Sequence, residues 1–400
     1  MIEILYLIFM LIITPEFLFF IIMLFGLMLF HHRKLLTAAS GFIVLSAIFI
    51  YRGGFSGYAA HFLHPNEYHL LYNLLLLLPG FGLVSHYFES SGIDEKIEGY
   101  ISSDRVLLWV VFALSIVLDN IAAAMIGGIL LSARYGKDVP FIMLASVIAS
   151  ANLGGAGSFA GDTTTVMLFV SGVSILTLAK GFIGATASQF VILFFSNRHG
   201  HSPVKRHEDN RKPLNYRMFF PLLAIPSMAV GNIVFDQPGL GLWAGLLLGV
   251  AIGRVKFHVA SIVKSLENTI FLTVLVATGG LLPLAKLQPL LDKFSKDTVA
   301  VILGFLSPWF DNIPLTKIAI DIGGFDWGLL AYCVGFGGSA IWFGSSAGVA
   351  LALQYPQVYE TKRWLKPFFI IMFAYVIGII AHFTIAKIVS LTAHWYRGLY

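Results

Sequence analysis

Long apolar stretches alternate with short polar connections along almost the whole chain. A membrane-spanning helix needs about 20 mostly apolar residues, so each long stretch predicts one crossing. The short connections favour helices that pass back and forth through a bilayer. The predicted crossings are residues 2–13, 15–30, 35–50, 69–88, 141–172, 175–195, 218–235, 239–253, 268–288, 328–355 and 367–390.

Two further apolar stretches, 106–131 and 299–320, are each interrupted near the middle by an Asp-Asn pair. A charged residue at the bilayer centre costs about 2.5–3.5 kcal/mol on insertion scales. A simple span is therefore disfavoured for both stretches. We expect each of them to form a re-entrant helical hairpin.

The order of these elements divides the chain into four parts. Residues 1–14 are expected to hold a short first transmembrane segment, because Thr14-Pro15-Glu16 has the signature of a new helix start. Residues 15–195 and 218–400 each contain five crossings and one hairpin. The basic loop 196–217 is expected in the cytoplasm, an orientation that puts most of the 26 Lys and Arg residues on that side. The stretches 90–105 and 254–266 are expected to be short interfacial segments.

Two motifs occur twice, in the same order. Ser-x-x-x-Asp-Asn-Ile at 115–121 recurs at 307–313, and the Gly-Gly pattern of 154–162 recurs at 337–345. An odd number of crossings turns the second copy upside down in the membrane. Inverted repeats with broken helices are typical of secondary transporters, whose sites lie where the breaks meet. We therefore expect an all-α polytopic membrane protein with two inverted repeats, each with a hairpin and an unwound helix.

The composition agrees with this prediction. Hydrophobic residues make up 58% of the 400 residues and charged residues only 12%, whereas soluble domains carry about a quarter charged residues. A single cysteine, Cys333, excludes a disulfide scaffold. We expect a multi-pass protein of the lipid bilayer, in a bacterial inner (plasma) membrane, with no nucleic-acid partner.

Polar residues inside the apolar stretches are the candidates for chemistry. Glycines lower helix propensity, so the glycine-rich run before Asp162 predicts an unwound stretch at membrane depth, where only buried or cavity-lining backbone is tolerated. Carbonyl, hydroxyl and carboxylate oxygens there are ligands for a hard cation. The candidate ion-binding residues are Asp119, Asn120, Asp162, Thr163, Thr164, Thr165, Asp311, Asn312, Ser345 and Ser346.

The three aspartates select the substrate class. Asp119, Asp162 and Asp311 would repel an anion, so a cation is favoured. Buried carboxylates hold a proton or a metal ion on the same oxygens, and this competition would couple two opposite fluxes. Helix capping by single aspartates is the structural alternative.

Other polar residues in or near the apolar stretches are weaker candidates. Lys317 either pairs with an aspartate or approaches the outer surface, and we favour the surface. For His61, His64 and His69 we favour a surface segment over a metal site.

At these residues the chain resembles a known family. The string Ala-Asn-Leu-Gly-Gly-Ala-Gly-Ser-Phe-Ala-Gly-Asp-Thr-Thr-Thr at 151–165 is similar to the signature of NhaD-type sodium/proton antiporters, and 310–314 and 344–348 are similar to its counterparts in the second half. These antiporters belong to the ion transporter superfamily of arsenite pumps and citrate-transporter-like carriers. The resemblance covers about 106–349. It implies an ion and proton path through Asp119, Asn120, Asp162, Thr164, Thr165, Asp311, Asn312 and Ser345.

The resemblance also implies exchange of Na⁺ (or Li⁺) for H⁺ by alternating access, an elevator motion and a homodimer, with no cofactor beyond the transported ions. The main alternative is a sodium-coupled di- or tricarboxylate or other anion transporter of the same superfamily. An intramembrane enzyme is disfavoured, because Phe159 stands where an aspartyl protease motif needs glycine and proteolysis needs no duplicated site.

Overall fold

The computed structural model describes residues 14–30, 33–91, 101–136, 138–196, 215–235, 237–283, 286, 293–310 and 312–397. Within these ranges the chain is helical and contains no strand, which confirms the predicted all-α class. Three predicted features lie outside the described residues: the crossing at 2–13, nearly all of the basic loop 196–217, and Asp311. Most of the predicted interfacial segment 90–105 also lies outside them.

The helices follow the predicted apolar stretches closely. In chain order they are α2 (Pro15–Leu29), α3 (Lys34–Leu63), α4 (Pro65–Ser90), α6 (Asp104–Val117), α7 (Asn120–Tyr135), α8 (Phe141–Gly155), α9 (Thr163–Val170), α10 (Ile175–Ala179), α11 (Gly181–Ser196), η2 (Tyr216–Leu223), α12 (Ala224–Phe235), α13 (Pro238–Gly253), α14 (Val259–Gly280), α16 (Lys296–Leu306), α17 (Asn312–Ile322), α18 (Trp327–Gly337), α19 (Ser346–Gln354) and α20 (Leu365–Arg397). Short 3₁₀ turns η4 (Gly338–Ala340) and η5 (Trp342–Gly344) separate α18 from α19, and η6 (Pro356–Tyr359) and η7 (Thr361–Trp364) precede α20.

Several helices are long and apolar enough to cross a bilayer. Among the described residues there are five: Lys34–Leu63, Glu67–Val84, Ile175–Ser196, Val259–Gly280 and Thr361–Ile388. Shorter apolar helices account for others of the predicted crossings, because a broken span divides into two pieces that are each too short alone.

The bounds of two helices, α3 and α14, differ from the prediction. The helix α14 begins at Val259 and ends at Gly280, whereas the apolar pattern predicted 268–288 and assigned 254–266 to an interfacial segment. Hydropathy marks the part of a helix that lies in hydrocarbon, and helical hydrogen bonds continue into polar sequence beyond it. The helix α3 continues to Leu63 rather than ending near residue 50, with a kink at Gly54 (φ +73°) that only glycine adopts easily.

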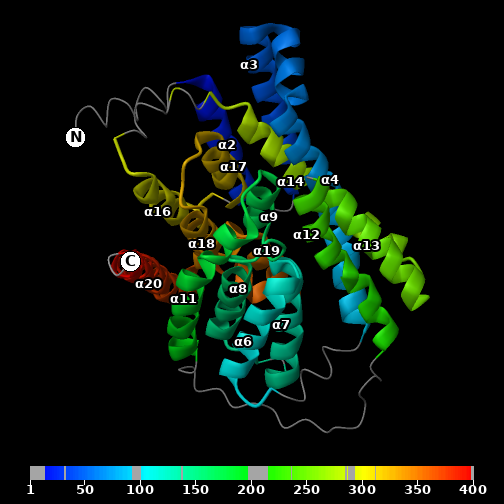
Figure 1. Ribbon diagram of the computed structural model, residues 1–400, viewed down its shortest axis with the longest axis vertical. Coiled ribbons are helices and arrows are strands. Elements are labelled where there is room, and N and C mark those ends of the chain that lie inside the picture. Colours follow the sequence, from blue (N-terminus) through cyan, green and yellow to red (C-terminus); the bar gives the residue numbers. More distant parts are fainter. Residues whose placement is uncertain are drawn as a thin grey trace.

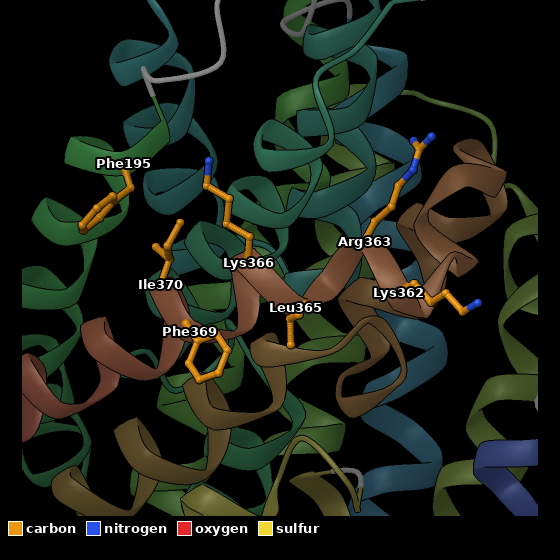
Figure 2. Close-up of a pocket in the computed structure, with 7 residues that line it drawn as sticks. All are labelled: Phe195, Lys362, Arg363, Leu365, Lys366, Phe369 and Ile370. Carbon is orange, nitrogen blue, oxygen red and sulfur yellow. The ribbon is translucent and has the colours of Figure 1, made fainter.

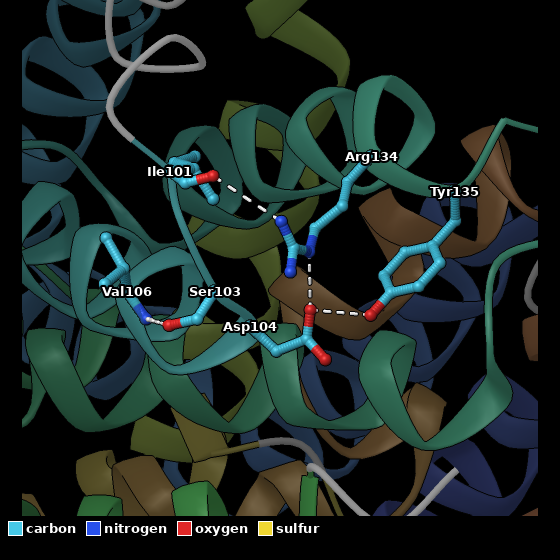
Figure 3. A network of polar contacts seen from close by, with 6 residues as sticks. All are labelled: Ile101, Ser103, Asp104, Val106, Arg134 and Tyr135. Carbon is cyan, nitrogen blue, oxygen red and sulfur yellow. Dashed lines mark hydrogen bonds and ion pairs between the residues drawn. The ribbon is translucent and has the colours of Figure 1, made fainter. Parts of the chain in front are cut away.

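The predicted hairpins correspond to two helix pairs, α6–α7 and α16–α17. A cluster at the open end of the first pair holds its helices together (Figure 3). Asp104 Oδ1 accepts hydrogen bonds of 2.6 Å from both Arg134 Nε and the Tyr135 hydroxyl. Ser103 caps α6 by accepting from the Val106 amide at 3.3 Å. The break between the helices falls at Leu118 and Asp119, as the Asp-Asn pair predicted.

The helices α8 and α18 form the centre of the molecule. Residues 143–155 of α8 and 328–337 of α18 are buried on all sides, as expected for helices that are apolar all round. In Figure 1, α6 and α7 extend below the central α8, α9, α18 and α19, and α17 lies above them. The helices α4, α12, α13 and α14 lie on one flank, and α11 and α20 on the other.

Both central helices end in an irregular stretch at the predicted position. After Gly155 the backbone is non-helical until Thr163, and after Gly337 it passes through two 3₁₀ turns to Ser346. A side chain at Gly161 would collide with the Ser115 carbonyl oxygen, so glycine permits the close approach of this stretch to α6. Both breaks are therefore packed inside the protein, as membrane depth requires.

Candidate ion-binding site

Asp162 is the centre of a buried polar cluster. It directly precedes α9 and is fully buried (0% exposed). Its Oδ1 atom accepts hydrogen bonds from Asn120 Nδ2 at 2.7 Å and from Asn312 Nδ2 at 3.4 Å. The first donor begins α7 and the second begins α17, so one carboxylate connects the two predicted hairpins.

Four helices begin at this cluster. Asn120, Thr163, Asn312 and Ser346 are the first residues of α7, α9, α17 and α19. A helix N-terminus carries a partial positive charge from its unpaired amides. The four termini therefore partly compensate the buried negative charge of Asp162.

Asn152 joins the two broken helices. From α8 it accepts a hydrogen bond from Asn120 Nδ2 at 2.9 Å, and its own Nδ2 donates to Ser339 Oγ at 2.8 Å and to Ser345 Oγ at 3.0 Å. All four side chains are buried. Asn152 and Ser339 were not among the predicted site residues. The available signal for Asn152 was an amide inside an otherwise apolar, fully buried helix, where a polar group needs partners.

Two oxygens near Asp162 are buried without a hydrogen-bond partner among the described residues. They are Thr164 Oγ1 and Asn312 Oδ1. Buried polar atoms without partners are rare and mark water or ion sites. Together with the Asp162 carboxylate they provide amide, hydroxyl and carboxylate oxygens, the ligands that a hard cation prefers.

The structure brings most of the other predicted residues close to Asp162. Ser346 Oγ donates to Asn120 Oδ1 at 3.5 Å, Ser345 caps α19, and Thr163 Oγ1 donates to Asp162 Oδ1 at 3.5 Å. Thr165 differs, because its hydroxyl donates to the backbone carbonyls of residues 162 and 155 at 2.9 and 3.4 Å. It therefore fixes the turn rather than facing the carboxylate.

Asp119 takes the structural role that was weighed as its alternative. Its Oδ1 atom accepts a hydrogen bond from the Ala122 amide at 2.7 Å and so caps α7. In the described part of the chain no hydrogen bond joins Asp119 to Asp162. Asp311, its counterpart in the second Asp-Asn pair, lies outside the described residues.

Lys317 does not approach the surface, and that expectation was wrong. Its side chain is only 1% exposed, and Nζ pairs with Glu67 of α4 and with Asp321 Oδ1 at 2.6 Å. A buried ammonium needs paired carboxylates, and Glu67 supplies one from 250 positions away in sequence. Because the two residues are so far apart in the sequence, this ion pair could not be predicted from it.

A groove at the start of α20 lies on another part of the molecule. It has a volume of about 530 Å³ and is lined by Phe195, Lys362, Arg363, Leu365, Lys366, Phe369 and Ile370 (Figure 2). Its basic and apolar lining differs from the acidic and amide lining around Asp162. The groove is therefore not part of the candidate ion site.

Apolar helices and a buried polar cluster at two helix breaks define a multi-pass membrane protein. No family model matches the chain. The chain is similar to sodium/proton antiporter 2 of Arabidopsis thaliana (28% identical over 302 residues, 61% of this chain and 69% of that protein). It is similar also to sodium/proton antiporter 1 of the same plant (26% over 293 residues, 62% and 50%) and to Na(+)/H(+) antiporter NhaD of Vibrio cholerae (25% over 325 residues, 68% and 68%).

These relatives confirm the predicted resemblance to NhaD-type antiporters. The match spans half the length of antiporter 1 and about two thirds of the other two relatives.

Proposed function

We propose that this protein exchanges Na⁺, or Li⁺, for H⁺ across a plasma membrane by alternating access. The observation that carries the proposal is the fully buried carboxylate of Asp162, which accepts hydrogen bonds from Asn120, Asn312 and Thr163 at the starts of three helices. The names of the relatives, which are sodium/proton antiporters, support the same activity.

The coupling follows from one group with two possible occupants. A carboxylate buried at membrane depth is expensive to leave charged and alone. It is neutralised equally well by a proton or by a monovalent cation. The proton and the cation compete for the same oxygens of Asp162. The site therefore carries a cation when it opens to one side of the membrane and a proton when it opens to the other, and opposite fluxes result.

The architecture proposed for this exchange has two inverted repeats, 15–195 and 218–400. The similar construction of α6–α7 with α8–α9 and of α16–α17 with α18–α19 supports the proposal. We further propose an elevator motion of the helix pairs and broken helices against the remaining helices, in a homodimer. On this proposal Asp119, Asp311 and Thr164 also belong to the ion and proton path.

The carboxylate-carrier alternative is less well supported. A carboxylate substrate would bind at neutral Ser, Asn and Thr side chains and helix N-termini, preferably with an arginine. Here the Asp162 carboxylate would repel it, and no Lys or Arg in the described part of the chain forms a hydrogen bond with Asp162, Asn120 or Asn312. Lys317, the basic residue nearest to Asn312 in the sequence, is bound to Glu67 and Asp321. An enzymatic role has no support from the relatives' names.

Transport by purified protein in liposomes tests the proposal. An imposed acidic interior is followed with a pH-sensitive dye while Na⁺, Li⁺, K⁺ or citrate is added outside. We expect Na⁺ and Li⁺ to release internal protons, with K⁺ and citrate no different from a choline control. Citrate uptake that depends on Na⁺, without proton movement, would instead support the anion carrier.

A further inference from the structure

A second buried polar cluster lies where α3, α4, α14 and α17 meet. Its centre is Lys317 of α17, which pairs with Glu67 of α4 and with Asp321 one turn further along α17. His61, near the end of α3, lies against Phe49 and Phe62, with ring centroids 5.5 and 5.0 Å away. Among the described residues, none of these side chains forms a hydrogen bond or an ion pair with Asp162.

Two atoms of this cluster are buried without a hydrogen-bond partner among the described residues: Glu67 Oε2 and His61 Nε2. Both face the same point on α14. A methyl group placed on Gly280 would stand 3.1 Å from Glu67 Oε2 and 3.3 Å from His61 Nε2. Glycine at this position therefore leaves a small space that an acceptor and an imidazole nitrogen share.

The charges of the cluster do not cancel. Glu67 and Asp321 carry two negative charges against the single positive charge of Lys317, so the group is anionic while His61 is neutral. The other titratable group acting on His61 is His64, and α14 faces the cluster at Gly279 and Gly280. Asp321 is exposed, so its charge is screened more than that of Glu67, whose Oε2 atom is buried without a hydrogen-bond partner among the described residues.

One added proton removes this net charge. A metal ion fits less well, because an ammonium group already occupies the carboxylates and the described residues contain no group of three or more His, Cys, Asp or Glu that could hold one. A proton shared between an imidazole nitrogen and a carboxylate oxygen through a bridging water molecule satisfies both unpartnered atoms at once.

We propose that His61, Glu67, Lys317 and Asp321 form a second proton-binding site, in which His61 and Glu67 share the proton across the space that Gly280 leaves. Protonation weakens the ion pair between Glu67 and Lys317. The helix α17 carries Lys317 and begins at Asn312, which donates to Asp162. The state of the second site is thus transmitted along α17 to the ion site. This transport role rests on the proposed function, whereas proton binding itself does not.

The direct test is NMR of purified protein with isotope-labelled histidine. The His61 signal is identified by its absence in H61Q. In E67Q we expect the pH midpoint of the His61 titration to move by at least one unit, a tenfold change in proton concentration. In E360Q, which removes an exposed carboxylate paired with Arg363, the midpoint stays within about 0.2 units. Identical His61 titrations in the wild type and E67Q would overturn the proposal.

The transport test measures exchange in liposomes against pH. We expect H61Q and E67Q to shift the pH of half-maximal exchange by about one unit, and E360Q, which removes an exposed carboxylate paired with Arg363, to leave it unchanged. Unshifted profiles in both variants would refute the link to transport. If the wild type exchanges no sodium, only the proposed function fails, and the NMR titration still decides the proton site.

Removal of Lys317 alone leaves the largely buried Glu67 carboxylate without its partner and risks misfolding. The triple variant E67Q/K317M/D321N has a neutral cluster and avoids this cost. We expect it to fold, and the midpoint of its His61 titration to differ from that of the wild type by at least one unit, as in E67Q. A His61 titration that matches the wild type in this variant would also overturn the proposal.

Discussion

Asp162→Asn separates the charge of the candidate site from its shape. The amide has almost the same size as the carboxylate, and its oxygen can keep the 2.7 Å hydrogen bond from Asn120. Its new NH₂ group would face the Asn312 amide, whose Oδ1 atom is buried without a partner among the described residues. Rotation of the Asn312 amide turns this unpaired oxygen toward the new donor. The variant therefore keeps its hydrogen bonds, and we expect it to fold like the wild type.

The lost charge has a large effect on ion binding. Two unit charges 4 Å apart attract each other by about 4 kcal/mol at an effective dielectric constant of about 20. A difference of about 1.4 kcal/mol is tenfold in affinity, so the loss corresponds to about a thousandfold weaker Na⁺ binding. The proton loses its acceptor as well. We expect exchange by the Asp162→Asn variant to fall at least a hundredfold.

Two measurements check this prediction. Exchange is measured in liposomes with a pH-sensitive dye, and binding is measured as the rise in melting temperature with Na⁺ concentration. The wild type and the surface variant E360Q should show both effects, and Asp162→Asn neither, although its melting temperature without Na⁺ is unchanged. Exchange within tenfold of the wild-type rate in Asp162→Asn would refute the assignment of Asp162 as the ion ligand.

Three further variants test individual contacts. Asn152→Leu leaves buried partners unpaired at about 1–3 kcal/mol each, so unfolding assays should show lower stability and liposomes at least tenfold slower exchange. Tyr135→Phe removes one donor to Asp104 and should cost about 1.5–3 kcal/mol in denaturant unfolding, with exchange within twofold of wild type. The hydrogen bond from His382 lowers the pKa of Asp326 to about 2. This bond stabilises the fold above about pH 4, and the stabilisation is lost as the pH falls toward 2. His382→Leu should therefore flatten the acid dependence of the melting temperature.

The helix breaks could be predicted from sequence because their causes are local. Glycine runs and Asp-Asn pairs disfavour a continuous helix wherever they stand, and the structure breaks at Leu118–Asp119 and at 156–162 as expected. The ends of α3 and α14 were not predictable in this way. Hydropathy reports the environment of a residue, and both helices continue through polar sequence where their environment changes.

The contacts between distant helices could not be predicted. Lys317 looked like a surface residue because its partner Glu67 lies 250 positions earlier in the chain. Asn152 looked like one small polar residue in an apolar helix, and its bonds to Ser339 and Ser345 cross more than 180 positions. Residue type indicated that such groups need partners, but only the packing of α8 against the second break and of α17 against α4 identifies them.

The two breaks share a glycine pattern but not a charge, and this asymmetry accounts for the competition that we propose at the site. Ser345 stands where the first break has Asp162, and Asn152 connects both positions through Asn120. A second carboxylate at Ser345 would place two like charges in one buried network, where the second would hold a permanent proton or require a divalent ion. With one carboxylate the cluster around Asp162 needs one positive charge. On the proposed mechanism a sodium ion or a proton supplies this charge, and the two compete because they use the same carboxylate.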